Sequence, residues 1–215
     1  MLSTPVRHKL ALFLFVLCAG LSLNLPAVQL NDPSYVGAKA CGDCHQQQYQ
    51  LWKQSDHHQA MQIATADSVL GDFSGVTLRF HNIDSRFYMR DQRYFVDTLD
   101  KKGKQATFQI KYTFGYQPLQ QYLLEMDKGH IQAFNIAWDS RAKEQGGQRW
   151  FHLQPDENIT PEHPFFWARH FQNWNSRCAT CHSSNVDKNY DAQTHSYNTT
   201  WSEINVSCEA CRERV

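Results

Sequence analysis

The chain has 215 residues, of which 41% are hydrophobic and 20% are charged, so it is long enough for one domain or two small ones. Its 21 basic and 21 acidic side chains give a formal net charge of zero at pH 7. Proteins that bind nucleic acids carry a basic excess, which this chain lacks. We therefore expect no nucleic-acid partner.

The first residues have the pattern of a secretory signal. Residues 7–9 read Arg-His-Lys, an apolar run follows over residues 10–23, and Pro26 comes shortly after it. The run is short for crossing a bilayer, so we interpret residues 1–23 as a cleaved signal peptide. Membrane contact is expected only through an uncleaved signal. The expected location is the periplasm of a bacterium of the Gram-negative type.

Residues 31–66 form the first segment after the signal. Residues 46–62 contain no glycine or proline, and Tyr49, Trp52, Met61 and Ala64 fall near one face at the helical period. The spacing predicts a helix from residue 41 to about residue 64. Its apolar face fits either a protein core or the wall of a flat ligand.

Residues 71–150 are predicted to form an antiparallel, β-rich middle region. Phe108, Ile110, Tyr112 and Phe114 alternate with polar residues, which is typical of a half-buried strand. Further elements are expected in the rest of this region: strands at 87–90, 93–99 and 130–138, turns at 91–92 and 100–103, a strand or short helix at 119–126, and a loop at 141–148.

The last segment, residues 151–215, begins with a polar connector that contains prolines. The expected fold class is therefore α+β, in which helical segments flank the β-rich middle region and much of the chain is irregular.

The cysteines show an unusual arrangement. Of the seven, Cys18 falls in the apolar run, and the other six form Cys-x-x-Cys pairs. Two pairs are followed directly by histidine, at residues 41–45 and 178–182. Such motifs attach haem c through two thioether bonds, and the adjacent histidine binds the iron. We expect two covalent haem c groups, attached to Cys41, Cys44, Cys178 and Cys181, with His45 and His182 as proximal iron ligands.

Zinc sites and redox-active thiol pairs also use Cys-x-x-Cys spacing. Zinc half-sites usually lie within about 12 to 20 residues of each other, whereas most of the chain separates the two complete motifs. A thioredoxin-like motif needs a βαβ setting, which the sequence around Cys41 lacks. Both interpretations are less favoured than haem attachment.

The third pair, Cys208 and Cys211, is followed by Arg212 instead of histidine. A guanidinium group offers no free lone pair and cannot bind iron. We interpret these residues as a degenerate third motif without haem.

The chain contains 11 histidines, and we expect some of them to be distal iron ligands. Coordination by two histidines closes the sixth position of the iron and suits electron transfer. His57 follows the first motif in the pattern Trp52-x-x-Ser55-x-His57, and on the same helix as His45 it is better placed for a neighbouring haem. The other candidates are His58, His81, His152, His163 and His170.

Several segments together resemble a known family. They are Ala40-Cys-Gly-Asp-Cys-His45, Trp52-x-x-Ser-x-His57-x-x-Ala-Met61, Glu144-Gln-Gly-Gly-Gln-Arg-Trp-Phe-His152, Gln172-Asn-Trp-Asn175, Cys178-x-x-Cys-His182 and Trp201-Ser-Glu-Ile-x-Val-Ser-Cys-Glu-Ala-Cys211. They resemble bacterial multihaem cytochromes of the cytochrome c-552/4 type, whose close relatives also carry tetratricopeptide repeats. The resemblance covers nearly everything after the signal. It implies that His45 and His182 are proximal ligands and His57 a distal one.

The sequence departs from this family after Cys211. Relatives would continue with a histidine, a Gly-Pro-Gly turn, more haem motifs and helical repeats, whereas Arg-Glu-Arg-Val follows here. We therefore expect the chain to be truncated at its C-terminal side.

The expected function is that of an exported multihaem cytochrome that transfers electrons between redox partner proteins. One alternative is a haem-based oxidoreductase acting on nitrogen compounds, which needs a five-coordinate iron, and no Cys-x-x-Cys-Lys motif or other obvious signature of one occurs in the sequence. Another is a non-functional N-terminal fragment of a larger protein.

Overall fold

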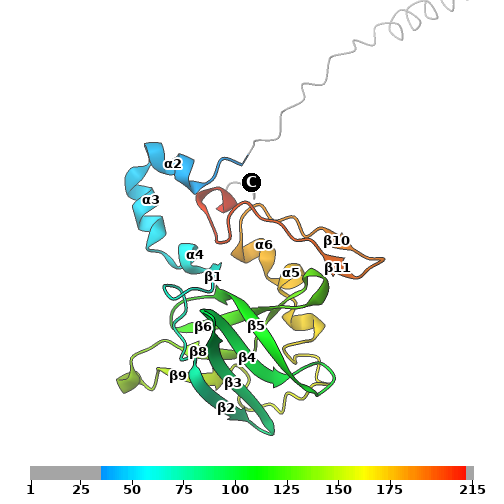
Figure 1. Ribbon diagram of the computed structural model, residues 1–215. Coiled ribbons are helices and arrows are strands. Elements are labelled where there is room, and N and C mark those ends of the chain that lie inside the picture. The colour runs from blue at the N-terminus through cyan, green and yellow to red at the C-terminus, as the bar shows by residue number, and fades with distance from the viewer. Residues whose placement is uncertain (1–34, 212–215) are drawn as a thin grey trace, which may run out of the picture. The chain divides into compact units, whose positions relative to one another are not determined.

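The computed structural model describes residues 35–211, which belong to one unit of the chain (Figure 1). The expected signal at residues 1–23 and the residue Arg212 lie outside this range. Within it, no helix combines the length and the apolar character needed to cross a bilayer.

An antiparallel sheet of nine strands forms the lower part of the described fold in Figure 1. Its strands are β1 (Met61–Ile63), β2 (Ser74–Phe80), β3 (Ile83–Arg90), β4 (Arg93–Leu99), β5 (Gln105–Phe114), β6 (Leu119–Glu125), β7 (Ile131–Ala133), β8 (Ile136–Asp139) and β9 (Arg149–His152).

Seven strands follow one another in the order β2-β3-β4-β5-β6-β8-β9, while β1 pairs with β5 and β7 pairs with β6. The sheet is nearly closed into a barrel-like shape. Phe80 at the end of β2 stacks on His152 at the end of β9, with the rings 3.7 Å apart and parallel. These strands confirm the expected α+β class with an antiparallel middle region.

Aromatic side chains fill the interior of the sheet. The ring of Phe87 stacks on that of Trp150 at 3.7 Å, and the ring of Phe73 packs edge-on against Trp150 and Tyr122. All four side chains are buried. Burying a side chain of this size contributes about 1.5–3 kcal/mol, so this cluster accounts for much of the stability of the sheet.

The single helix expected from residue 41 to residue 64 is not found, and that prediction was wrong. The structure has three short helices instead, α2 (Ala38–Cys44), α3 (Gln46–Lys53) and α4 (Asp56–Gln59). His45 leaves the helical region at φ −112° and ψ 52°, which separates α2 from α3. The Ser55 hydroxyl donates to the carbonyl of Trp52 at 2.7 Å, where α3 ends. A side chain that bonds its own backbone in this way competes with helix continuation.

Met61 and Ala64 therefore do not share a helical face with Tyr49. Met61 belongs to β1, where it pairs with Phe114 of β5. Local periodicity did not reveal this strand, because the partner that stabilises it lies about fifty residues further along the chain.

The middle region follows the sequence pattern more closely. The strand expected at 93–99 is β4, and residues 119–126 form a strand and not a helix. The strand expected at 130–138 is split into β7 and β8, because Phe134 bonds back to the carbonyl of Tyr122 between them. The loop expected at 141–148 contains the short 3-10 helix η2 (Lys143–Gln145).

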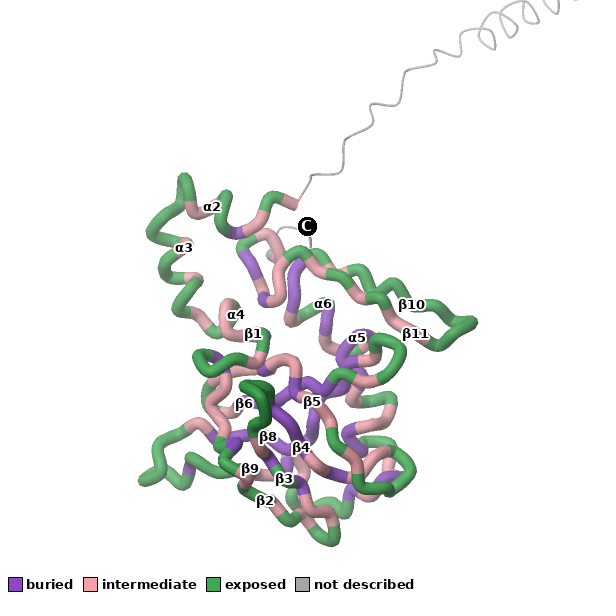
Figure 2. Tube along the Cα trace, viewed as in Figure 1, coloured by how far each residue is buried: buried purple, intermediate pink, exposed green. Residues whose placement is uncertain are grey.

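The segment after the sheet contains only short elements. They are η3 (His170–Gln172), α5 (Trp174–Arg177), α6 (Ala179–His182), β10 (Tyr190–Asp191), β11 (Ser196–Tyr197) and η4 (Cys208–Cys211), and η1 (Asp127–Gly129) lies earlier, between β6 and β7. A second core of buried residues joins α5 and α6 to the sheet: Met61, Leu123, Ile131, Ala133, Trp174 and Ala179. In Figure 2 buried residues therefore concentrate in the sheet and around α5 and α6, while α2 and α3 are mostly exposed.

Candidate haem-binding site

The two complete cysteine motifs share one local backbone geometry. In the first, the amide of His45 donates to the carbonyl of Cys41 at 2.8 Å; in the second, the amide of His182 donates to the carbonyl of Cys178 at 3.1 Å. Each motif therefore closes one helical turn. Residues three and four apart in such a turn lie on the same side, so each motif presents two thiols and an imidazole together.

The four thiols of these motifs, on Cys41, Cys44, Cys178 and Cys181, are free. The second thiol of each motif is exposed, and the first is partly buried. Burial raises the pKa of the Cys178 thiol, and the neighbouring Cys181 adds to the effect. Cys178 is consequently a neutral thiol at neutral pH.

The first motif lies on an arm formed by α2 and α3. None of the residues of α3 is buried, and Leu51 is 64% exposed. The rings of Tyr49 and Trp52 lie 5.5 Å apart on this helix. Apolar side chains that the protein leaves uncovered fit the wall of a flat apolar group, so the arm is suited to a porphyrin.

Gly42 allows the arm to fold back on itself. A Cβ atom at this position would lie 2.8 Å from the ring of Tyr49, closer than real Cβ contacts occur. The glycine between the two cysteines therefore lets Tyr49 pack against the helix that carries the motif.

His182 of the second motif has a buried ring nitrogen without a partner. Its ring lies 4.4 Å from that of Phe114, and its Nδ1 atom makes no hydrogen bond among the described residues. Buried polar atoms are nearly always satisfied, so an orphan of this kind points to a group that is absent from the chain itself. Burial also lowers the pKa of His182, which keeps the imidazole neutral, as iron ligation requires. The residues of the second motif fit haem.

The adjacent histidines His57 and His58, both in α4, have different surroundings. The His57 ring is exposed and is not engaged by any described side chain, while its backbone carbonyl accepts from the amide of Val206 at 3.2 Å. The His58 ring packs edge-on against Trp52 at 4.7 Å, and its buried Nδ1 has no partner among the described residues. Burial and Lys53 lower the pKa of His58.

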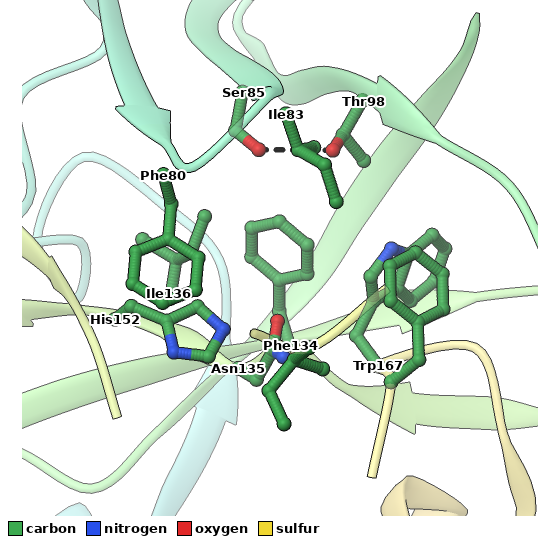
Figure 3. A pocket seen from close by; sticks show the side chains of 11 residues that line it. Phe80, Ile83, Ser85, Thr98, Phe134, Asn135, Ile136, His152 and Trp167 are labelled. Carbon is green, nitrogen blue, oxygen red and sulfur yellow. Dashed lines mark hydrogen bonds between the residues drawn. The ribbon is translucent and has the colours of Figure 1, made fainter. Parts of the chain in front are cut away.

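Two other candidate ligands belong to the sheet. The His152 ring stacks on Phe80 in a small pocket inside the sheet, as Figure 3 shows, and its Nδ1 accepts from the amide of Gln154 at 3.1 Å. Burial lowers the pKa of His152 to about 4. His81 is exposed in the turn between β2 and β3.

The last two candidates, His163 and His170, precede the second motif. Nδ1 of His163 accepts from the amide of Phe165 at 3.2 Å. Arg177, which adjoins Cys178, lies 2.6 Å from Nε2 of His170 through its guanidinium group. Of the candidates outside α4, His170 is therefore linked most directly to an attachment motif.

The third cysteine pair forms η4, which lies beside α2 in Figure 1. Arg212, on which the degenerate interpretation rests, is outside the described residues. Glu209, between the two cysteines, reaches the backbone of Gly37 at 2.7 Å. Sequence reasoning missed this residue and Glu203, which contacts the same helix, since no local pattern reports a contact across 165 residues or more.

No group of three or more His, Cys, Asp or Glu side chains that could hold a metal ion occurs in the described part of the chain.

The sequence profile of the family described as "Cytochrome c554 and c-prime" matches residues 40–72 and 136–212, which is just over half of the chain. The chain belongs to this cytochrome family. No curated protein and no solved structure matched it.

The matched residues of this cytochrome contain both complete motifs, His57 and the third cysteine pair. The match leaves out residues 73–135, which hold the strands from β2 to β7. Most of the sheet therefore lies outside the part that the family profile covers.

Proposed function

We propose that this cytochrome carries haem c at both complete motifs and transfers electrons between redox partner proteins. The observation that supports this most directly is the backbone geometry the two motifs share: in each, the amide of the histidine closes a helical turn on the carbonyl of the first cysteine, and both thiols are free. Membership of the cytochrome family gives independent support.

The roles of the residues follow from their chemistry. Cys41 and Cys44 would hold one haem, and Cys178 and Cys181 the other, through thioether bonds. His45 and His182 would each offer an imidazole to an iron. Haem c supplies a one-electron couple when bound. Phe114 packs against the ring of His182 and keeps water from that side of it.

Electron transfer is favoured over catalysis because histidines remain for the sixth position of each iron. His57 is the first of these, since it is exposed and the family resemblance implies it as a ligand. An iron with protein ligands on both faces of the porphyrin cannot bind a substrate, whereas it can still exchange electrons through the edge of the porphyrin ring.

The proposed location is the periplasm, which the signal pattern of the sequence supports. Redox partners usually meet over small, short-lived contacts. The exposed arm of α2 and α3 offers a surface of that kind next to the first motif.

Replacing Cys44 or Cys181 with alanine tests the attachment sites. Each variant is expected to lose one thioether and to retain less haem after acid-acetone extraction, because a single covalent bond and the iron ligand must hold the ring. The measurement is pyridine-haemochrome absorbance per chain, and Cys208→Ala is the matched control that should keep the full absorbance. Full absorbance in both test variants would show that the attachment assignment is incorrect.

A further inference from the structure

Residues 203–209 contact both haem-binding segments, although they hold no complete motif. We name them the 203–209 segment. They lie at the C-terminal side of the chain and overlap the degenerate third motif through Cys208 and Glu209. Their hydrogen bonds reach residues that flank the first motif on one side and the residues that directly follow the second motif on the other.

Two carboxylates of this segment bind the first turn of α2. Glu209 accepts from the amides of Val36 at 3.2 Å and Gly37 at 2.7 Å, and Glu203 accepts from the amide of Ala38 at 3.1 Å. Gly37, the N-cap residue, has no side chain to do this. Carboxylates bonded to the free amides at a helix start stabilise the helix through charge-assisted bonds and its dipole.

The other end of the arm is attached to the same segment. The indole nitrogen of Trp52 donates to the carbonyl of Val206 at 2.8 Å. The amide of Val206 donates in turn to the carbonyl of His57, and the side-chain amide of Asn205 donates to the carbonyl of His58 at 3.0 Å. The hydrogen bonds seen for residues 39–51 stay within residues 37–54, that is, the arm and the residues that flank it. The 203–209 segment thus holds the arm at both ends.

The segment also pairs with the residues that follow His182. The amide of Ser184 donates to the carbonyl of Glu203 at 3.0 Å, and the hydroxyl of Ser183 donates to the carbonyl of Ile204 at 2.8 Å. The hydroxyl of Ser184 donates to the carbonyl of Asn205 at 2.8 Å and accepts from the amide of Ser207 at 2.8 Å. Because Ser183 adjoins His182, one short segment connects both motifs.

We propose that Glu203 and Glu209 are positioning residues, and that the 203–209 segment fixes the first motif relative to the second. The consequence for haem rests on the proposed function. Under this proposal the backbone turn that carries the third cysteine pair has a structural role through Glu209, which holds the start of α2. Electron exchange between haems depends on their separation, so such a connection would set the rate at which the two irons communicate.

Amide hydrogen exchange tests the connection without reference to haem. In the full chain, the amide hydrogens of residues 36–38 are expected to exchange about tenfold faster than in the wild type when a glutamate is replaced, because a charged acceptor becomes a neutral one. The variants are Glu203→Gln, Glu209→Gln and the double variant. The amides of β4 should not change. The control is Glu157→Gln, because no hydrogen bond or ion pair of the Glu157 side chain is seen among the described residues. Unchanged exchange at residues 36–38 in the double variant would overturn the proposal.

A redox titration of the haem-loaded protein tests the positioning role. The double variant should shift the reduction potential of the haem at the first motif. The redox transition of that haem is identified as the one that Cys44→Ala alters. Using Glu209→Asp in place of Glu209→Gln should partly restore the wild-type potential. Faster exchange with both reduction potentials unchanged would show that the segment has only a structural role and would overturn the positioning proposal. A wild-type chain without haem would contradict the proposed function instead, and hydrogen exchange alone would then decide whether the connection exists.

Discussion

At the scale of single residues, neighbours in sequence can differ completely in surroundings. His57 and His58 follow each other in α4, yet the first ring is exposed and the second packs against Trp52. An exposed ring can turn toward an added group with little loss of packing. A ring that already forms part of a packed cluster gives up those contacts if it moves.

This difference leads to a prediction for the pair. His57→Ala should convert one haem from low-spin to high-spin iron that binds carbon monoxide, because its sixth ligand is lost. His58→Ala is the matched control, and it should lower stability by about 1–2 kcal/mol through the lost Trp52 contact while the iron stays low-spin. Absorbance and electron paramagnetic resonance spectra measure the spin state. The reverse result, with high-spin iron in the His58 variant alone, would assign the ligand to His58.

The attachment residues could be predicted from the sequence because their chemistry depends on spacing within five residues. Nothing equally local marks Glu203 or Glu209. Each is an ordinary acidic residue until the fold brings it to the first turn of α2, across 165 to 173 residues of chain. Contacts of this length are specified by the fold and are invisible to short patterns.

At the scale of elements, the strands were easier to predict than the helices. Alternation with a period of two located β5, and the turn expected at residues 100–103 placed the preceding strand β4 at its observed bounds. The helical period of residues 41–64 concealed two breaks and a strand. Short helices gain little from their own hydrogen bonds, so contacts with the rest of the chain decide where they end.

The closure of the sheet leads to a prediction about acid. His152 joins β9 to β2 by stacking on Phe80, and its pKa falls from 6.5 to about 4 on folding because of burial. The unfolded chain therefore binds more protons between these values, and the folded state loses stability as the pH falls from 6.5 to 4. The loss amounts to about 3 kcal/mol below pH 4, since one pKa unit corresponds to about 1.4 kcal/mol.

Urea unfolding at a series of pH values measures this effect. The variant His152→Gln cannot titrate and should show a shallower decline of stability between pH 6.5 and 4 than the wild type. His195→Gln, which removes an exposed histidine between β10 and β11, is the control and should leave the slope nearly unchanged. Equal slopes for the wild type and His152→Gln would contradict the assignment of the acid response to His152.

At the scale of the whole molecule, the family match divides the chain into two matched parts with most of the sheet between them. The two matched parts, residues 40–72 and 136–212, flank the strands β2 to β7. The end of the first matched part is held close to the second, since the indole of Trp150 in β9 donates to the carbonyl of Asp72 at 3.0 Å. The strands β2 to β7 thus lie between two matched parts that contact each other.

The number of haems is the prediction that belongs to this scale. Intact-mass measurement should find the processed chain plus two haem groups, because two motifs have both cysteines and a histidine and the third has Arg212. On a denaturing gel stained for peroxidase activity, the band of this protein should stain, because covalently attached haem stays on the chain. Three haems would show that the third pair is functional, and an unmodified mass would refute haem attachment altogether.

The two ends of the described chain meet, and this imposes an order on assembly. Bonds between residues 36–38 and the acids at 203 and 209 enclose a loop of nearly the whole chain, and closing such a loop costs more entropy the longer its free portion is. Strands joined by short turns can form early, because their contacts are local. Once these strands have formed, most of that loop is already compact, and closing the remainder costs little entropy. We therefore predict that the first motif reaches its final place late, which would leave it accessible for the proposed haem attachment while the sheet is already folded.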